Sequence, residues 1–228
     1  MNKTDLKLYA ITDRQWLRGA RLSEHVKLAI EGGATMIQIR DKDILSTDSD
    51  AGLKDEYNEA LEIKRICHEH NVPLIINDNV QFAIDIDADG VHLGQDDMNP
   101  AEARKLLGTD KIIGVTAKTV EQAKRAEADG ADYLGSGAVF GSTTKLNAKP
   151  MTKELLREIT AAVDIPVVAI GGIDETNIDK LRGRKMSGFA VVSAIFAKDD
   201  IKAAAEQLSG LAHDLLRTDA TTNVTTDL

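Results

Sequence analysis

The stretch KIIGVTAKTVEQAKRAEADGADYLGSG, residues 111–137, contains the unit from which we expect the whole fold to be built. It begins with a short β-branched run (111–117), continues through a segment with helical spacing (120–130), and ends in a second apolar run (132–137). A strand followed by a helix and another strand predicts two parallel strands joined by a right-handed crossover.

The same alternation runs through the chain and gives eight predicted strands: 6–12, 35–40, 73–78, 90–94, 111–117, 132–137, 166–172 and 188–193. Residues 200–217 have helical spacing and close the series. Eight repeats favour an α/β protein that is a single (β/α)8 TIM barrel, with eight parallel strands and an active site at their C-terminal ends. An open doubly wound sheet has the same local pattern, but its G-x-G-x-x-G fingerprint is absent after the first strand.

Length and composition fit one barrel. The chain has 228 residues, and a barrel of this type needs about 200 or more. We therefore expect one catalytic domain over residues 1–217. The remaining residues, 218–228, are polar and without periodicity, so we expect a disordered tail.

The net charge of −9 argues against nucleic acid or an anionic membrane as partner. It does not exclude phosphorylated small molecules, because backbone N–H groups and a few cations can bind phosphate locally. The single cysteine fits a reducing compartment, and we find neither a signal peptide nor an apolar run long enough to span a bilayer. We expect a cytoplasmic protein and leave a homo-oligomer open.

Polar residues interrupt the second predicted strand. With a period of two, Gln38 and Arg40 share one face and Ile37 and Ile39 share the other. The isoleucines fit the interface with the helices, so Gln38 and Arg40 should point into the barrel. A cation there is costly unless an anion meets it, which is either a ligand or an internal salt bridge.

Carboxylates follow the third and fourth strands, in Asn77-Asp78-Asn79 and Gln95-Asp96-Asp97. Carboxylates at two adjacent strand ends suit Mg²⁺, which combines a few of them with substrate phosphate oxygens. The alternative is that these residues are N-caps of the helices that follow.

Two further regions indicate phosphate binding. Residues 137–145 combine glycine, three hydroxyls and a lysine after the sixth strand. The seventh and eighth strands end in Gly171-Gly172 and Val192-Ser193, where barrels usually bind phosphate, although ordinary glycine turns are the alternative. We interpret His92, in the fourth strand, as a hydrogen-bonded core residue.

In their joint order these motifs resemble the thiamine phosphate synthase family. The resemblance extends from LYAITD (8–13) through VVSAIF (191–196) and leaves out the polar tail. Its motifs are QIRDK (38–42), INDN (76–79), DGVHLGQDD (89–97), GVTAKT (114–119), GADYLGSG (130–137), STTK (142–145) and AIGGI (169–173).

The resemblance implies a transferase that joins hydroxymethylpyrimidine pyrophosphate to hydroxyethylthiazole phosphate, giving thiamine phosphate and pyrophosphate, with Mg²⁺ as cofactor. It implies that Asp78 and Asp97 bind the metal and that Arg40, Lys42, Lys145 and Thr116 act at the reacting centre. The substrate-binding residues it implies are Gln38, Ile39, Arg40, Asp41, Lys42, Asn77, Thr116, Ser142, Thr143, Thr144, Lys145, Gly172, Val192 and Ser193.

Several positions depart from the family pattern. Asn79 stands where an aspartate is usual, Thr116 where serine is usual and Lys118 where histidine is usual, while Ala138 and Gly141 replace prolines. Two rival functions are a thiazole tautomerase, which would not couple the two substrates, and a non-catalytic barrel that binds a phosphorylated ligand. The residues Arg40, Lys42, Asp78, Asp97 and Lys145 together favour the synthase, since neither rival needs to hold a pyrophosphate.

Overall fold

The computed structural model describes residues 3–40, 50–141 and 150–222 and has a closed barrel of eight parallel strands. The strands follow one another in chain order, and β1 closes the ring by pairing with β8, with Leu8 opposite Phe189. This confirms the predicted fold, and each predicted strand contains an observed one. The strands are β1 (Leu8–Ile11), β2 (Met36–Ile39), β3 (Leu74–Asn77), β4 (Gly90–Leu93), β5 (Ile112–Thr116), β6 (Tyr133–Gly137), β7 (Val167–Ile170) and β8 (Gly188–Val191).

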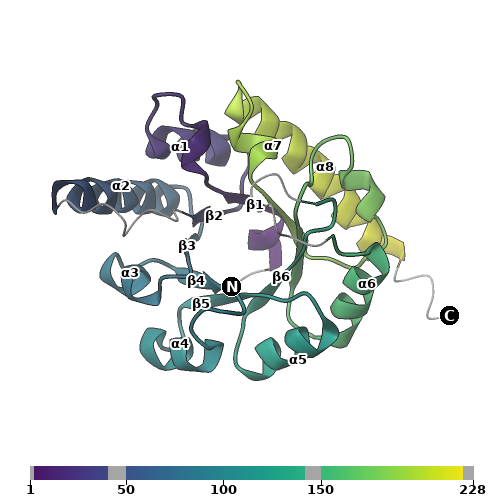
Figure 1. Ribbon diagram of the computed structural model, residues 1–228. Helices are drawn as coiled ribbons and strands as arrows, with labels where there is room; N and C mark the ends of the chain where they lie inside the picture. The colour runs from purple at the N-terminus through teal and green to yellow at the C-terminus, as the bar shows by residue number, and fades with distance from the viewer. Residues whose placement is uncertain (1–2, 41–49, 142–149, 223–228) are drawn as a thin grey trace.

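Helices surround the barrel as an outer ring (Figure 1). The connection between β7 and β8 contains only a short 3₁₀ turn, η3 (Ile178–Leu181), in place of an α-helix. Two other 3₁₀ turns are η1 (Lys3–Leu6) and η2 (Arg14–Trp16). The α-helices are α1 (Leu22–Glu31), α2 (Asp50–Glu69), α3 (Val80–Asp85), α4 (Pro100–Leu107), α5 (Val120–Ala128), α6 (Lys153–Ala162), α7 (Ser193–Phe196) and α8 (Ile201–Thr222).

The strand residues alternate between two buried layers. Ile37 and Ile39 belong to the core between barrel and helices, as the sequence pattern predicts. A separate apolar cluster fills the inside of the barrel and includes Tyr9, Met36 and Tyr133. Because side chains alternate along each strand, the residues between the outward isoleucines point inward, and this alternation places polar groups above the inner cluster.

The last helix corrects the predicted boundary of the tail. α8 continues to Thr222, so residues 218–222 are helical and not disordered as expected. No proline or glycine follows Arg217 before residue 222, so nothing in the sequence stops the helix from extending. Residues 223–228 lie outside the described part of the chain. Within that part, no helix is both long and apolar enough to cross a membrane.

Candidate active site

A cavity of about 390 Å³ opens where the carboxyl ends of the strands meet. This is the end at which barrels of this architecture form their active sites. The cavity brings together many of the residues singled out from the sequence: Gln38, Arg40, Asn77, Asp78, Asp97, Thr116, Gly172, Val192 and Ser193. Other predicted site residues, namely Asp41, Lys42, Ser142, Thr143, Thr144 and Lys145, lie outside the described residues.

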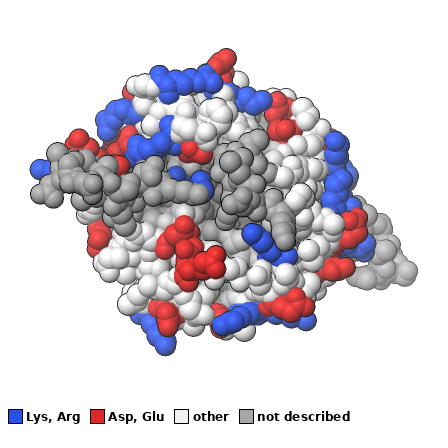
Figure 2. Space-filling view, in the orientation of Figure 1, with Lys and Arg blue, Asp and Glu red and all other residues white. Residues whose placement is uncertain are grey.

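Both acidic and basic side chains line the cavity. Its lining includes three carboxylates, Asp78, Asp96 and Asp97, and two cations, Arg40 and Lys118. Figure 2 shows a group of acidic side chains near the centre of one face of the molecule, with basic side chains close to it as well as around the rim. The overall negative charge is therefore compatible with local cations that could bind phosphate.

The end of β2 supplies Gln38 and Arg40. Gln38 is buried, and its Nε2 donates a hydrogen bond to the Tyr9 hydroxyl at 2.5 Å. Ile39 between them is 3% exposed and packs against the helices, so its side chain does not line the cavity. The expectation that Ile39 binds substrate is therefore wrong for its side chain, because alternation along the strand turns it outward.

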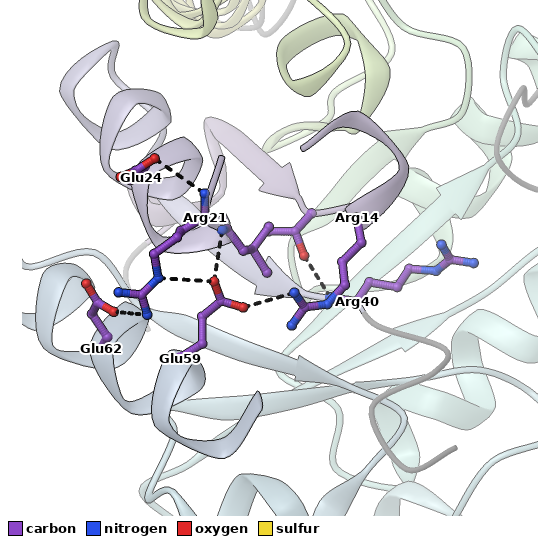
Figure 3. A network of polar contacts seen from close by, with 8 residues as sticks. Arg14, Arg21, Glu24, Arg40, Glu59 and Glu62 are labelled. Atoms are coloured by element: carbon purple, nitrogen blue, oxygen red, sulfur yellow. Dashed lines mark hydrogen bonds and ion pairs between the residues drawn. The ribbon is translucent and has the colours of Figure 1, made fainter. Parts of the chain in front are cut away.

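Glu59 of α2 joins the segment after β1 to the helix that follows β2 (Figure 3). Its carboxylate accepts hydrogen bonds from Arg14 Nη1 and from the backbone N–H of Leu22, both at 2.9 Å. The Arg40 side chain points away from this network in Figure 3. Among the described residues Arg40 has no ion pair within 4 Å, so the internal salt bridge considered from the sequence is not observed there.

Asp78 and Asp97 come from the ends of β3 and β4 and lie side by side. The pKa of Asp78 is raised to about 6, first by loss of solvation in the cavity and then by the neighbouring Asp97 carboxylate. Asn77, whose Nδ2 donates to Asp78 Oδ2 at 2.6 Å, and Arg40 partly oppose this rise in pKa. Two carboxylates held together in this way repel each other, and a cation between them would relieve the repulsion.

Neither of these carboxylates caps a helix. The N-cap of α3 is Asn79, whose Oδ1 accepts from the N–H of Phe82 at 2.9 Å, and the N-cap of α4 is Asn99. Asp97 instead accepts from the N–H of Gly94 at 2.6 Å. The structure therefore explains the departure at Asn79, because asparagine and aspartate cap helices about equally well.

The donor set at this position fits Mg²⁺. Asp78 and Asp97 would supply two hard oxygen ligands, and Mg²⁺ in such sites is typically completed by substrate phosphates and water. The described residues contain no group of three or more His, Cys, Asp or Glu that could hold a metal ion.

The ends of β7 and β8 present Gly172, Val192 and Ser193 to the cavity. Gly172 has φ of 65°, in the left-handed region, and a Cβ there would lie 2.7 Å from the carbonyl oxygen of Phe140. A side chain at residue 172 would therefore be strained and crowded. The glycine therefore lets the backbone of Phe140 and Gly141 pack closely against it, at the place where barrels usually bind phosphate.

His92 and Thr116 are joined at the floor of the cavity. His92 Nε2 lies 3.0 Å from Thr116 Oγ1, and its Nδ1 lies 3.0 Å from the hydroxyl of Tyr133. The interpretation of His92 as a hydrogen-bonded core residue holds only in part: it is hydrogen-bonded, but its side chain is half-buried and lines the cavity. Its inward place in β4 was visible in the sequence, whereas its contact with Thr116 of β5 depends on the strand register.

This fold and site define a class of protein: a (β/α)8 barrel enzyme with a site for phosphorylated small molecules at the carboxyl ends of its strands. Comparison with known proteins narrows the class. The family model described as thiamine monophosphate synthase matches residues 8–195. The chain therefore belongs to the thiamine monophosphate synthase family, and the resemblance found in the sequence motifs is confirmed.

Comparisons with individual proteins agree with this family assignment. A protein of Clostridium tetani named thiamine-phosphate synthase is 45% identical over 210 residues, which are 92% of this chain and 97% of the relative. One of Clostridium novyi with the same name is 46% identical over 206 residues, covering 90% and 98%. The solved structure of a thiamine phosphate pyrophosphorylase from Pyrococcus furiosus superposes with a TM-score of 0.83 at 36% identity, covering 94% of this chain and 98% of that one.

Proposed function

We propose that this protein joins 4-amino-2-methyl-5-(diphosphooxymethyl)pyrimidine to 4-methyl-5-(2-phosphooxyethyl)thiazole, giving thiamine phosphate and pyrophosphate, and that the reaction requires Mg²⁺. The observation that supports this most is the meeting of Arg40, Asp78 and Asp97 with Gly172 and Ser193 in one cavity. Two separate places for phosphate groups are needed to hold both substrates at once.

The pyrophosphate would lie at the ends of β2, β3 and β4. Arg40 would bind its oxygens directly, and Asp78 and Asp97 would hold Mg²⁺ against them. The metal, when bound, supplies positive charge that stabilises the departing pyrophosphate. From the sequence resemblance, Lys42 and Lys145 would add two further cations to this place. Charge placed in advance where charge develops is usually the largest contribution to catalysis.

The thiazole phosphate would lie at the ends of β7 and β8. Gly172 would offer its backbone to the phosphate from the cavity wall, and Val192 and Ser193 begin the short α7 beside it. From the sequence resemblance, Ser142, Thr143 and Thr144 would add hydroxyl donors. Holding both substrates by their phosphates places the thiazole nitrogen near the pyrimidine methylene carbon and converts a bimolecular reaction into an effectively unimolecular one.

The chemistry needs no strong general base. The bond between the methylene carbon and the pyrophosphate oxygen breaks, and its electron pair leaves with pyrophosphate. The aminopyrimidine stabilises the positive charge left on carbon, and the thiazole nitrogen then supplies the electron pair of the new carbon–nitrogen bond. No proton is transferred in either step, so the residues of the cavity have to bind, orient and neutralise charge.

A thermal-shift titration with the pyrimidine pyrophosphate, with and without Mg²⁺, separates this proposal from its rivals. A synthase should be stabilised much more when both are present than by either alone. A thiazole tautomerase or a barrel that only binds a phosphorylated ligand should respond to the thiazole phosphate and show no joint effect of Mg²⁺ and the pyrimidine pyrophosphate, which would count against our proposal.

A further inference from the structure

A continuous chain of hydrogen bonds crosses the inside of the barrel below the cavity. Gln38 Nε2 donates to the Tyr9 hydroxyl, which lies 2.9 Å from the hydroxyl of Tyr133. The Tyr133 hydroxyl in turn lies 3.0 Å from His92 Nδ1, and His92 Nε2 lies 3.0 Å from Thr116 Oγ1. The chain thus links a cavity residue of β2 to a cavity residue of β5 through two tyrosines.

Both tyrosines are fully enclosed. Tyr9 is 1% exposed and Tyr133 is 0% exposed, and their rings pack edge to face with centroids 5.9 Å apart. Burial raises the pKa of both phenols well above the ordinary value, so each keeps its one hydroxyl hydrogen. A Cβ on Gly114 would overlap the Tyr133 ring, so the bare backbone of β5 makes room for it.

The donor at one end of this chain of hydrogen bonds determines which atom donates in each of the others. Since the Tyr9 oxygen accepts from Gln38, the Tyr9 hydrogen has only the Tyr133 oxygen as acceptor among the described residues. The Tyr133 hydrogen is then directed at His92 Nδ1, which must be unprotonated to accept it. The opposite direction would leave the hydrogen of Tyr9 buried without an acceptor, which folded proteins avoid.

His92 is thereby held with its hydrogen on Nε2, and it donates to Thr116 Oγ1. The hydroxyl hydrogen of Thr116 is then free to point into the cavity. Gln95 steadies the same residue, because its Nε2 donates to the backbone carbonyl of Thr116 at 2.6 Å. The end of β5 therefore presents a hydrogen-bond donor of fixed direction.

We propose that Tyr133 is a positioning residue that holds His92 in this tautomer and so makes Thr116 a hydrogen-bond donor to the substrate. The proposal rests on the proposed function, since the ligand it fits is an aminopyrimidine. The ring nitrogens of that ligand accept hydrogen bonds and its exocyclic amine donates them. The hydroxyl of Thr116 would donate to a ring nitrogen, and the side-chain carbonyl of Gln38 would accept from the exocyclic amine. The two residues come from different sides of the cavity.

The first test is ¹⁵N nuclear magnetic resonance of the imidazole of His92, in the unaltered protein and in Tyr133→Phe, without substrate. We expect the neutral ring with hydrogen on Nε2, and partial loss of that preference in Tyr133→Phe. Hydrogen on Nδ1, or on both nitrogens, in the unaltered protein at pH 8 would overturn the proposal, whether or not the protein makes thiamine phosphate.

The second test is a double-mutant cycle of Tyr133→Phe and Thr116→Val, both close in shape to the original residues. Tyr133→Phe should lower kcat/KM for the pyrimidine substrate about tenfold, which corresponds to one buried hydrogen bond, and leave KM for the thiazole phosphate unchanged. In the Thr116→Val protein it should have little further effect. Tyr57→Phe, which removes an exposed hydroxyl bonded to the Asp85 carbonyl, is the matched control and should change neither constant.

Additive losses in the cycle, or a rise in KM for the thiazole phosphate as large as that for the pyrimidine substrate, would show that Tyr133 only packs the core and would overturn the proposal. If the unaltered protein makes no thiamine phosphate, the proposed function fails, and the His92 measurement still decides whether the hydrogen-bond chain has the stated direction.

Discussion

The carboxylates of Asp78 and Asp97 lie against each other at the ends of adjacent strands, and neither is used to cap a helix. Asp78 is also held with φ of 63°, a backbone conformation that costs about 1 kcal/mol or more in residues other than glycine. In the absence of a bound ligand, the strained backbone and the two repelling charges destabilise the protein. Both become understandable if a divalent cation and a phosphate meet there, as the proposed function requires.

Asp97→Asn should raise the concentration of Mg²⁺ needed for half-maximal activity, because one of two ligand carboxylates loses its charge. A Mg²⁺ titration of product formation measures this. Asn99→Ala is the matched control, since it removes the actual N-cap of α4. It should lower stability by about 1 kcal/mol and leave the titration unchanged. An Asp97→Asn protein with an unaltered Mg²⁺ titration would rule out the assigned metal role.

Stabilisation by Mg²⁺ should increase with pH between 5 and 7.5. In the metal-free protein the pKa of Asp78 is raised to about 6 from its ordinary 3.8. The stability linked to Asp78 is thus fully present below about 3.8 and is lost as pH rises through 6. The ionised carboxylate formed above pH 6 is the form that binds metal. The rise in Tm on adding Mg²⁺, measured across this range, should therefore be smallest at pH 5, and Asp78→Asn should flatten it. A constant rise in Tm would contradict the assignment.

Gly114→Ala should destabilise the protein by about 1–3 kcal/mol, because the new methyl group overlaps the ring of Tyr133 inside a packed barrel. It should also lower kcat/KM for the pyrimidine substrate by displacing the hydrogen-bond chain to Thr116. Urea unfolding and steady-state kinetics measure the two effects. Gly210→Ala serves as control, since nothing lies within 4 Å of its added Cβ on α8, and it should be neutral or stabilising. Equal stability of the two variants would argue against the described packing.

Gly172→Ala should raise KM for the thiazole phosphate, because the added methyl group crowds the Phe140 carbonyl and forces the backbone of the phosphate site to shift. Gly183→Ala is the matched control: its φ of 77° is also in the left-handed region, but nothing lies within 4 Å of its Cβ. Both variants should lose about 1 kcal/mol of stability from backbone strain, Gly172→Ala should lose more because of the crowding, and only Gly172→Ala should change KM. If the two variants show the same KM, the phosphate does not lie beside Gly172.

Much of the site could be predicted from the sequence because strand alternation fixes which side chains point inward. The pattern around Gln38 gave its orientation, and the outward isoleucines that flank it are confirmed in the helix-facing core. The side chain of Ile39 faces the helices and not the cavity, because a motif match selects a continuous stretch, whereas alternate residues of a strand face opposite sides.

The remaining features depend on the register of the strands and on where individual helices begin and end. The sequence shows that His92 faces inward, but its bonds to Tyr133 and Thr116 require three strands to be aligned. Similarly, capping by Asn79 and not by Asp78 is decided by a one-residue difference in where α3 begins. The helical extension to Thr222 was missed because polar composition was taken as a sign of disorder.

The most direct test of the account is to mix the purified protein with both phosphorylated substrates, with and without Mg²⁺, and to measure thiamine phosphate by mass spectrometry. We predict product, with pyrophosphate in equal amount, only when both substrates and Mg²⁺ are present. Absence of product from protein shown to be folded, under conditions in which a known thiamine-phosphate synthase is active, would contradict the proposed function.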